Sequence, residues 1–448
     1  MTESSSEYIL RTSKEYSVYI CSSRAIPKIT DGLKDSQRKM LWLMRNRSDK
    51  IKTVSLSGLA ISENLYLHGD QSASDAISML AAPYCNNVPL LEGIGSFGTR
   101  TIPTGWGAPR YTYVKRAKST QSLILHDLDI VPLKENYDGS TMEPEHFLPL
   151  IPVVLLNGIS GIASGWSTEI LPRSFKDLVD ATLAVLAGKS YPQLIPTYQY
   201  LECGVSHLEE NTWEFSGRVE LIDASTIKVT ELPPDLTLEK FKERLNAYEE
   251  EDKINSYIDR STKLINITIK MPRGSVRDWT ELQAVEFFKL KQKKTERIVV
   301  IDWNGTSIRQ YENAERVVKD FVDWRLTWFN KRYQSRLADD LYDLKYWQAV
   351  KACFDAKLPS RLGSKQNRSE IEADVLKITS AIGIDSKQVD RIVSVPTYKW
   401  AKDSYADVET KIAELSIMIV KHNVLLADPK LIRDVYKQEL LELKKIKL

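Results

Sequence analysis

The sequence predicts an α+β protein of several domains, and three observations lead to that prediction. The chain has 448 residues, which is more than one compact hydrophobic core usually holds. Segments between residues 218 and 274 alternate β-branched and polar residues, as half-buried strands do. From residue 314 onward, apolar residues recur instead at helical spacing.

The composition excludes several classes of protein. Hydrophobic residues make up 42% and charged residues 27% of the chain, which is typical of a soluble globular protein and not of a disordered or fibrous one. The formal net charge of +2 does not by itself indicate a nucleic-acid-binding protein. Such a role would need basic residues gathered on one face.

The cysteines and the hydropathy of the sequence indicate in which cellular compartment the protein works. The cysteines Cys21, Cys85, Cys203 and Cys353 lie far apart and form no CxxC pair, which suits a reducing environment. The N-terminus lacks the apolar segment of a signal peptide, and no apolar run approaches the roughly 18 residues of a membrane span. We therefore expect a cytoplasmic protein without membrane contact.

Two helices are predicted in the first third of the chain, after residues 1–23, which we expect to form an arm or a short helix. Residues 34–46 have a basic face opposite an apolar face, and the apolar face consists of Met40, Leu41 and Met44. A second helix is predicted over residues 72–83, with Asp70 or Ser72 as its N-cap and a proline at its end.

The middle of the chain has the pattern of a mixed α+β domain. Strands are predicted within residues 218–234 and 264–274, and a charged helix is predicted between them in residues 238–254. Residues 295–311 are typical of a hairpin that turns at its Asn-Gly dipeptide.

The last third is predicted to be helical. A first long helix is marked by Phe321, Trp328, Leu337, Leu341 and Leu344. A second series forms a short heptad seam, made of Val408, Ile412, Leu415 and Ile419. Residues 359–400 between them contain prolines and glycines and are predicted to form a small globular insert. This order suggests an antiparallel coiled coil with a knob at its tip.

Several short motifs look like nucleotide or metal sites but are better interpreted as ordinary structural segments. GIGSFG (93–98) matches a dinucleotide-binding pattern but is not placed between a strand and a helix of a βαβ unit. AGKS (187–190) lacks the first glycine of a P-loop. The pair Asp127 and Asp129 is more often a solvated loop than a metal site, and the five histidines form no HExxH motif.

Two segments carry a local excess of positive charge. Residues 24–47 contain seven basic and two acidic residues, and residues 100–118 contain five basic and no acidic residues. Such a local excess in a near-neutral protein is typical of a confined surface that contacts phosphates. A solvated helix face is an equally good interpretation of composition alone.

The second basic segment contains APRYTYVK, in which Arg110 directly precedes Tyr111. A free phenol has a pKa of about 10, so only about one molecule in a thousand is ionised at neutral pH. A tyrosine that attacks a phosphodiester therefore needs cationic neighbours, which stabilise the phenolate and the pentavalent phosphate. Arg110, Lys34, Arg38 and His68 are of the right types. On pattern alone, the more frequent interpretation of Tyr111 is a half-buried aromatic residue of a strand.

Four segments resemble motifs of the type IIA DNA topoisomerases, and they occur in the order found in that family. They are RAIPKITDGLKDSQRK (24–39), LHGDQSASDAI (67–77), GIGSFGTR followed by APRYTY (93–113), and ENYDGSTMEPEHFLPLIPVVLLNGISGIASGWSTEILP (135–172). In the first third of the chain the resemblance lies in the motifs themselves. In the rest it lies in the predicted order of domains, a mixed domain followed by a long coiled coil with a globular tip. Length and domain content are most similar to the DNA-cleaving subunits of bacteriophage members, with gyrase A subunits as more distant relatives.

The resemblance implies a division into domains. In chain order they are an N-terminal arm (1–23), a winged-helix DNA-cleavage domain (24–166), a mixed α/β tower domain (167–312), a long antiparallel coiled coil (313–358 and 401–448) and, at its tip, a small globular exit-gate dimerisation domain (359–400).

The resemblance also implies roles for particular residues. Tyr111 would form a 5′-phosphotyrosyl bond with DNA, and Arg110 would stabilise the pentavalent phosphate. Ile162 would wedge between base pairs and bend the DNA, although without the resemblance a core isoleucine is the preferred interpretation. The residues expected to contact DNA near the break are Arg24, Lys34, Arg38, Lys39 and His68.

The same resemblance implies partners and cofactors. The chain would act as a homodimer on double-stranded DNA, together with a second protein that carries ATPase and Toprim domains. That partner would bind ATP and hold most of the Mg²⁺, so no metal site is expected in this chain and the chain alone should be inactive. The sequence ends in LELKKIKL soon after the second long helix, without a DNA-wrapping β-pinwheel, so we expect relaxation of DNA and not gyrase-like supercoiling.

Two other functions stay open. A non-catalytic, architectural DNA-binding protein could retain the same scaffold, and covalent DNA adducts would distinguish it. A nicking or relaxing enzyme could work alone through its tyrosine, and dependence on a partner would distinguish that.

Overall fold

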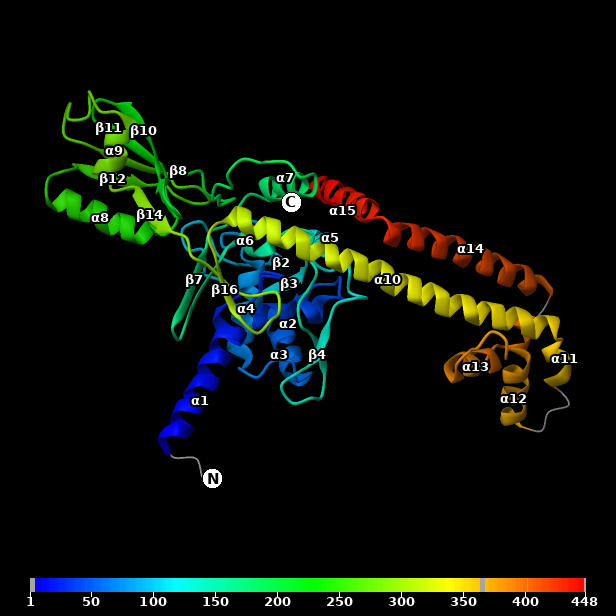
Figure 1. The fold of residues 1–448 in the computed structure, drawn as a ribbon. Helices are drawn as coiled ribbons and strands as arrows, with labels where there is room; N and C mark the ends of the chain where they lie inside the picture. The colour runs from blue at the N-terminus through cyan, green and yellow to red at the C-terminus, as the bar shows by residue number, and fades with distance from the viewer. Residues whose placement is uncertain (1–4, 363–366, 401, 447–448) are drawn as a thin grey trace. The chain divides into compact units, whose positions relative to one another are not determined.

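The computed structural model describes residues 5–362, 367–400 and 402–446. Its architecture is mixed α/β, and it divides into two compact units, Met1–Arg325 with Lys437–Leu448, and Leu326–Tyr436. Helices α10 (Ala314–Asp355) and α15 (Pro429–Lys444) each run from one unit into the other (Figure 1).

The first unit begins with helix α1 (Ser5–Ile20), which continues into a π-helical turn, η1 (Cys21–Ala25). In the ribbon, α1 extends outward from the blue helices that follow it (Figure 1). Three helices that contact one another come next: α2 (Asp35–Met44), α3 (Thr53–Ser62) and α4 (Asp70–Ala81).

Helix α2 confirms the helix predicted for residues 34–46, and its three predicted core residues are fully buried. The face expected to be basic differs from the prediction, because Arg38 and Lys39 are buried as well. Burial of two cations requires nearby carboxylates, and these are Asp31 and Asp35, which are close in sequence, and Glu143, which is distant.

Helix α4 confirms the second predicted helix but not its cap. Its N-cap is Gly69, which makes no side-chain cap and has a φ of 83°, a conformation that favours glycine. Asp70 is already helical, and the Ser72 hydroxyl lies 2.7 Å from the hydroxyl of Tyr66. The prediction of Asp70 or Ser72 as N-cap is therefore wrong.

The first unit also contains short antiparallel sheets. One has three strands in the order β1-β3-β2, and three others are two-stranded hairpins. Their bounds are β1 (Ile51–Lys52), β2 (Leu91–Ile94), β3 (Tyr113–Arg116), β4 (Leu133–Glu135), β5 (Met142–Pro144), β6 (Ile159–Ala163), β7 (Trp166–Ile170), β15 (Ile298–Ile301) and β16 (Ile308–Tyr311). The connecting helices are α5 (Lys118–Leu123), α6 (Val153–Asn157) and α7 (Phe175–Leu186).

The β15–β16 hairpin confirms the predicted Asn-Gly turn. Ile301 pairs with Ile308, and Gly305 between them has a φ of 72°. The side-chain oxygen of Asn304 accepts hydrogen bonds from the backbone amides of Thr306 and Ser307, which closes the turn.

The middle of the chain folds into two sheets and two helices. The sheets have the strand orders β10-β11-β13-β12 and β14-β9-β8. Bounds are β8 (Gly204–Glu209), β9 (Thr212–Ser216), β10 (Arg218–Asp223), β11 (Thr226–Glu231), α8 (Leu238–Glu250), β12 (Ser256–Asp259), β13 (Ile267–Lys270), α9 (Glu281–Phe287) and β14 (Lys291–Thr295). The strands and the charged helix predicted here are confirmed, and apolar residues of α8, such as Phe241 and Leu245, pack in one core with those of β11 and β13.

The second unit is helical. Besides parts of α10 and α15 it contains α11 (Leu358–Leu362), α12 (Arg368–Ile378), α13 (Ser386–Val393), η2 (Thr397–Trp400) and α14 (Lys402–Ala427). The globular insert predicted for residues 359–400 is a set of short helices, except that residues 363–366 lie outside the described residues. Its apolar residues share one core with α10 and α14.

Side-chain contacts show that α10 and α14 run antiparallel. Asp340 pairs with His422 at 2.9 Å, Lys351 with Glu409 at 2.7 Å, and Asp355 with Tyr405 at 3.0 Å. Residue numbers rise along one helix while they fall along the other, as in an antiparallel coiled coil.

The predicted seam of α14 is its least exposed side, with Val408 buried and the other three positions half-buried. Helix α10 confirms the first long helix predicted, and along it Phe321 and Trp328 are buried whereas Leu341 is exposed. The buried face of α10 in the second unit is formed by Phe329, Tyr333, Tyr346, Val350 and Cys353. Large aromatic residues take the inner positions there, and this shifts the face away from the leucines.

Across the described residues, no helix is both long enough and apolar enough to cross a lipid bilayer.

The π-helical turn η1 packs tightly against the β6–β7 hairpin. A Cβ atom built on Gly161 would lie 2.0 Å from the backbone oxygen of Ala25, closer than any real contact. We therefore expect Gly161→Ala to push the hairpin from η1 and to destabilise the protein by about 1–3 kcal/mol in thermal unfolding.

The control for this prediction is Gly58→Ala in helix α3, where a Cβ would meet no atom within 4 Å. That change should leave stability unchanged or raise it by up to about 1 kcal/mol, because alanine is the better helix former. Equal effects of the two substitutions would contradict the close packing of Gly161.

Candidate functional site

Tyr111 lies in a turn just before β3, and it is 70% exposed. Its backbone amide donates to the carbonyl oxygen of Ala108 at 2.9 Å, which closes the turn. The guanidinium carbon of Arg110 is 4.8 Å from the centroid of the Tyr111 ring, within cation–π distance. The interpretation of Tyr111 as a half-buried strand residue is therefore wrong.

The turn that carries Arg110 and Tyr111 is fixed by the N-terminus of α3. The first amides of a helix lack partners within the helix. Here the amide of Thr53 donates to the carbonyl of Thr112 at 3.0 Å, and the amide of Val54 donates to the carbonyl of Pro109 at 3.2 Å. The Thr53 and Thr112 hydroxyls, both buried, lie 2.8 Å apart. Tyr111 thus projects into solvent from a backbone held on both sides.

The loop that leads to this turn is tied to the middle of the chain by a buried ion pair. Arg100 donates to the carboxylate of Glu231 at the end of β11 and, at 3.3 Å, to the carbonyl of Leu232. The second carboxylate oxygen of Glu231 accepts from the amide of Glu202 at 3.1 Å. Because both Arg100 and Glu231 are buried, this pair restrains where the loop lies.

A second group of predicted residues is brought together around His68. The Arg24 guanidinium lies 2.7 Å from His68 Nδ1, and the Tyr19 hydroxyl lies 2.8 Å from His68 Nε2. The ring of Tyr66 packs edge-on against the imidazole at 5.4 Å between centroids. Burial, followed by the charges of Arg24 and Lys39, lowers the pKa of His68.

Arg24, His68 and Tyr19 line one side of a cavity of about 620 Å³. The rest of the lining is mixed: it includes Leu67, two lysines, Lys39 and Lys134, and three carboxylates, Asp35, Glu135 and Glu143. Neither Tyr111 nor Arg110, both described residues, makes a hydrogen bond or ion pair with Arg24 or His68. The predicted site residues thus fall into two separate groups within one chain.

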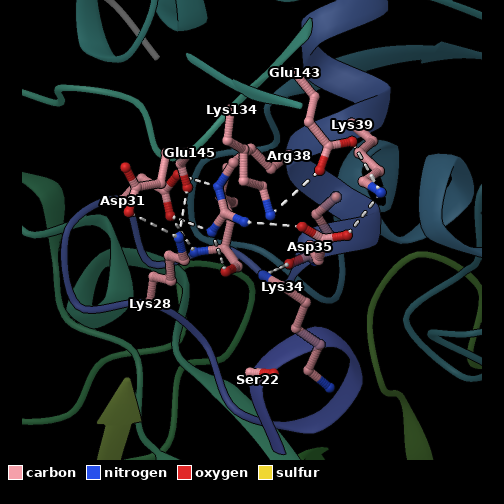
Figure 2. A network of polar contacts seen from close by, with 12 residues as sticks. Ser22, Lys28, Asp31, Lys34, Asp35, Arg38, Lys39, Lys134, Glu143 and Glu145 are labelled. Carbon is pink, nitrogen blue, oxygen red and sulfur yellow. Dashed lines mark hydrogen bonds and ion pairs between the residues drawn. The ribbon is translucent and has the colours of Figure 1, made fainter. Parts of the chain in front are cut away.

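Arg38 does not face the cavity. It is 2% exposed, and its guanidinium makes two hydrogen bonds to Asp31, at 2.6 and 2.9 Å, and one to the carbonyl of Leu33 at 2.8 Å. Figure 2 shows it enclosed by carboxylates. The Arg38 guanidinium is therefore held by protein groups, and its predicted contact with DNA stays a prediction.

Lys39 is also held by carboxylates. Its amine lies 3.1 Å from Asp35 and 3.0 Å from Glu143, and Lys134 approaches the other oxygen of Glu143 at 3.3 Å (Figure 2). Burial tends to lower the pKa of Lys39, but Asp35 and Glu143 outweigh it and raise that pKa above its usual value. Lys39 therefore stays charged at the cavity wall, with its charge compensated.

Lys34 points away from the carboxylate cluster in Figure 2. Its amine donates to the backbone carbonyl of Ser160 at 2.8 Å, and burial lowers its pKa. Lys34 thus binds the β6–β7 hairpin, in which Ile162 is 87% exposed. A core position for Ile162 is therefore excluded.

Comparison with known proteins places the chain in a family. The sequence model that describes the A subunits of DNA gyrase and topoisomerase IV matches residues 24–441. The chain belongs to this family. The resemblance to type IIA topoisomerases seen in the motifs is thereby confirmed. The eight predicted site residues all lie inside the match, whereas Tyr19 precedes it.

Individual members of the topoisomerase family differ in how much of their length is shared. The chain is 29% identical over 401 residues to the DNA topoisomerase medium subunit of Enterobacteria phage T4, covering 87% of this chain and 88% of the relative. It is 31% identical over 324 residues to DNA topoisomerase 2-alpha of Gallus gallus, covering 69% of this chain but 21% of that protein.

A solved structure shares the fold. The DNA-binding, cleavage and re-ligation domain of Plasmodium falciparum topoisomerase II superposes with a TM-score of 0.84 at 24% identity, covering 98% of this chain and 64% of that one. The mixed α/β fold of the topoisomerase II cleavage domain is therefore shown for this chain.

The described residues contain no group of three or more His, Cys, Asp or Glu side chains that could hold a metal ion. The two aspartates of the DxD pair do not lie together as ligands: Asp127 is buried against Arg325 at 2.5 Å, whereas Asp129 is exposed.

Sequence analysis did not predict a role for three residues in or near the cavity: Tyr19, Asp31 and Glu143. Asp31 lies in the turn before α2, outside the helix that carries Arg38, so helical periodicity does not pair the two residues. Glu143 reaches Lys39 only because the β4–β5 hairpin folds against α2. The positive charge of residues 24–47 can be counted in the sequence, but the carboxylates that pair with these cations cannot be predicted from it.

Asp31→Asn tests the buried ion pair. Burial raises the pKa of Asp31, but Arg38 outweighs it and lowers that pKa overall. A carboxylate with a lowered pKa stabilises the fold above the ordinary value of about 4, and this stabilisation is lost as the pH falls through the folded pKa. We expect Asp31→Asn to cost about 3–5 kcal/mol at pH 7, because Arg38 is left buried and unpaired.

Urea unfolding at several pH values measures this effect, with Asp129→Asn as the exposed control. The difference between the wild type and Asp31→Asn should shrink below pH about 4. A difference that stays constant with pH would mean that the carboxylate charge of Asp31 does not stabilise the fold.

Proposed function

We propose that this chain is the DNA-breakage-and-rejoining subunit of an ATP-dependent type IIA DNA topoisomerase. The observation that supports it best is the exposed phenol of Tyr111, which projects beside Arg110 from a turn clamped by α3. A nucleophile for a bulky polymer must be reachable from solvent, and a fixed backbone reduces the entropy lost on alignment.

In the proposed reaction, the Tyr111 oxygen attacks a backbone phosphorus as its phenolic proton leaves. The bond from phosphorus to the 3′ oxygen breaks, and that oxygen takes up a proton as the new 3′-hydroxyl. The product is a 5′-phosphotyrosyl ester, and rejoining is the reverse transfer with no separate energy source. Arg110 would stabilise the pentavalent phosphate through its charge and hydrogen-bond donors.

Arg24 and His68 would contact the DNA backbone from the cavity. Lys34 would support the hairpin that carries Ile162, and the 87% exposure of Ile162 supports its role as a wedge between base pairs. Arg38 and Lys39 would act indirectly, by holding α2 and the cavity wall in place.

The proposed assembly is a homodimer, in which one Tyr111 from each protomer cuts one strand so that a second duplex can pass through. Residues 24–166 would form the winged-helix part and residues 167–312 the tower that widens the DNA cradle. The coiled coil, residues 313–358 and 401–448, would carry the dimerisation tip of residues 359–400 as an exit gate. Residues 1–23 would form the N-terminal arm.

A partner protein would supply the remaining parts. Its Toprim domain would hold Mg²⁺, which supplies charge stabilisation for phosphoryl transfer, and its ATPase domain would bind ATP. The complex would relax DNA and would work in the cytoplasm, that of the host if the chain is encoded by a phage.

Tyr111→Phe tests the proposed nucleophile. We expect wild-type protein, mixed with supercoiled plasmid, Mg²⁺ and a competent ATPase/Toprim partner and then quenched with detergent, to yield protein-linked linear DNA. Tyr111→Phe should abolish the adduct because it lacks the attacking oxygen.

Tyr113→Phe is the matched control, because Tyr113 lies two residues along in β3 and is only half-buried. It should retain the adduct. Adducts that persist in Tyr111→Phe would assign the nucleophile elsewhere, and DNA binding without any adduct would favour an architectural protein. Adduct formation without the partner would favour an enzyme that acts alone.

Ile162→Ala tests the proposed wedge. Because the side chain is almost fully exposed, stability should change by less than about 0.5 kcal/mol. The DNA bend, measured by energy transfer between fluorophores at the two ends of a duplex, should decrease because no side chain then separates the base pairs. Leu264→Ala, at an exposed leucine elsewhere in the chain, should leave the bend unchanged; an equal loss there would argue against a wedge.

A further inference from the structure

We infer that Tyr19 is a further DNA-contacting residue, whose hydroxyl donates a hydrogen bond to a backbone phosphate at the cavity lined by Arg24 and His68. The inference rests on the proposed function and adds a residue to its DNA-binding surface. Tyr19 lies near the end of α1, outside residues 24–441 that match the family.

The direction of each hydrogen bond follows from Arg24. A guanidinium has donors only, so His68 Nδ1, 2.7 Å from Arg24 Nη2, must accept and carries no proton. The imidazole is then neutral, and its proton lies on Nε2, which is consistent with the lowered pKa of His68.

His68 Nε2 therefore donates to the Tyr19 hydroxyl oxygen at 2.8 Å. A tyrosine hydroxyl that accepts one hydrogen bond keeps its own proton for another acceptor. Within the described part of the chain, the Tyr19 hydroxyl makes no further hydrogen bond, and Tyr19 lines the cavity with an exposed fraction of 37%. The chain from Arg24 through His68 to Tyr19 thus ends in a free O–H donor, polarised by the preceding bonds.

The cavity is lined by three cations, Arg24, Lys39 and Lys134, and by three carboxylates, Asp35, Glu135 and Glu143, so an anion is favoured locally, beside Arg24. Asp35 and Glu143 are paired with Lys39, and Lys134 adds a second cation to Glu143. Arg24 is exposed, and none of the carboxylates in the described residues lies within ion-pair distance of it. Its positive charge is therefore uncompensated next to the Tyr19 hydroxyl.

A phosphodiester fits this arrangement. Its free oxygens carry negative charge and accept hydrogen bonds, and it has no donor of its own. Arg24 supplies charge, and Tyr19 supplies a neutral donor whose position is set by His68. Neutral hydroxyl donors to phosphates are frequent in protein–DNA interfaces, where they fix register.

The experiment compares Tyr19→Phe with the wild-type full chain in binding to a short fluorescent DNA duplex. Tyr16→Phe is the matched control, because Tyr16 lies on the same helix with its ring 6.5 Å from that of Tyr19 and does not line the cavity. Tyr19→Phe should weaken binding about tenfold, as expected for loss of one hydrogen bond to a charged acceptor. Tyr16→Phe should bind like the wild type.

Salt dependence separates the roles of the two residues. Tyr19 carries no charge, so Tyr19→Phe should keep the wild-type slope of log affinity against log salt concentration. Arg24→Ala should lower that slope by about one, because one phosphate contact of a cation is lost. A change of slope in Tyr19→Phe would overturn the assignment of a neutral donor.

The His68→Ala background tests the hydrogen-bonded chain. Without His68, the Tyr19 hydroxyl is neither oriented nor polarised, so Tyr19→Phe should then cost less than about threefold. The inference would be overturned if Tyr19→Phe still weakened DNA binding tenfold in the His68→Ala background. It would also be overturned if Tyr19→Phe bound DNA like the wild type, or if Tyr16→Phe lost as much affinity as Tyr19→Phe. Failure of wild-type protein to form the Tyr111 adduct would instead overturn the proposed function, so the two failures are distinguishable.

Discussion

The bidentate ion pair between Asp31 and Arg38 is the interaction on which the cavity region depends. Asp31 also accepts hydrogen bonds from the backbone amides of Leu33, at 3.1 Å, and Phe147, at 3.0 Å. One buried carboxylate thereby joins the segment after η1, helix α2 and a segment more than a hundred residues away. Because a buried charge without its partner is costly, the three segments are held in one arrangement.

The cations of residues 24–39 make different kinds of contact. Arg38 and Lys39 neutralise buried carboxylates, and Lys34 binds the β6–β7 hairpin through a carbonyl. Only Arg24, carried by the π-helical turn, faces the cavity without a carboxylate partner among the described residues. Single π-helical turns within helices are frequent at functional sites. The basic segment thus combines support of the fold with a single uncompensated charge.

The Tyr111 turn is positioned by different means. Backbone amides of α3 hold it on one side, and the loop before it is restrained by the Arg100–Glu231 pair. The two groups, one around Tyr111 and one around His68, are therefore each rigid in themselves. Rigid supports of this kind reduce the reorganisation needed when charge develops in a reaction.

The sequence by itself determined the helices and strands with clear periodicity, the Asn304–Gly305 hairpin and the family, because these depend on local spacing and on motifs in a fixed order. It also singled out Arg110 and Tyr111 as candidates, because they are adjacent in the chain. It could not tell that Arg38 is buried and Arg24 is not, since both lie in the same basic segment. That outcome is decided by Asp31 and Glu143, whose distances to the cations exist only after the chain has folded. Sequence analysis did not select Tyr19 for the same reason. Its inferred role depends on a hydrogen bond with His68, which is 49 residues away in the chain and lies next to Tyr19 only in the tertiary structure.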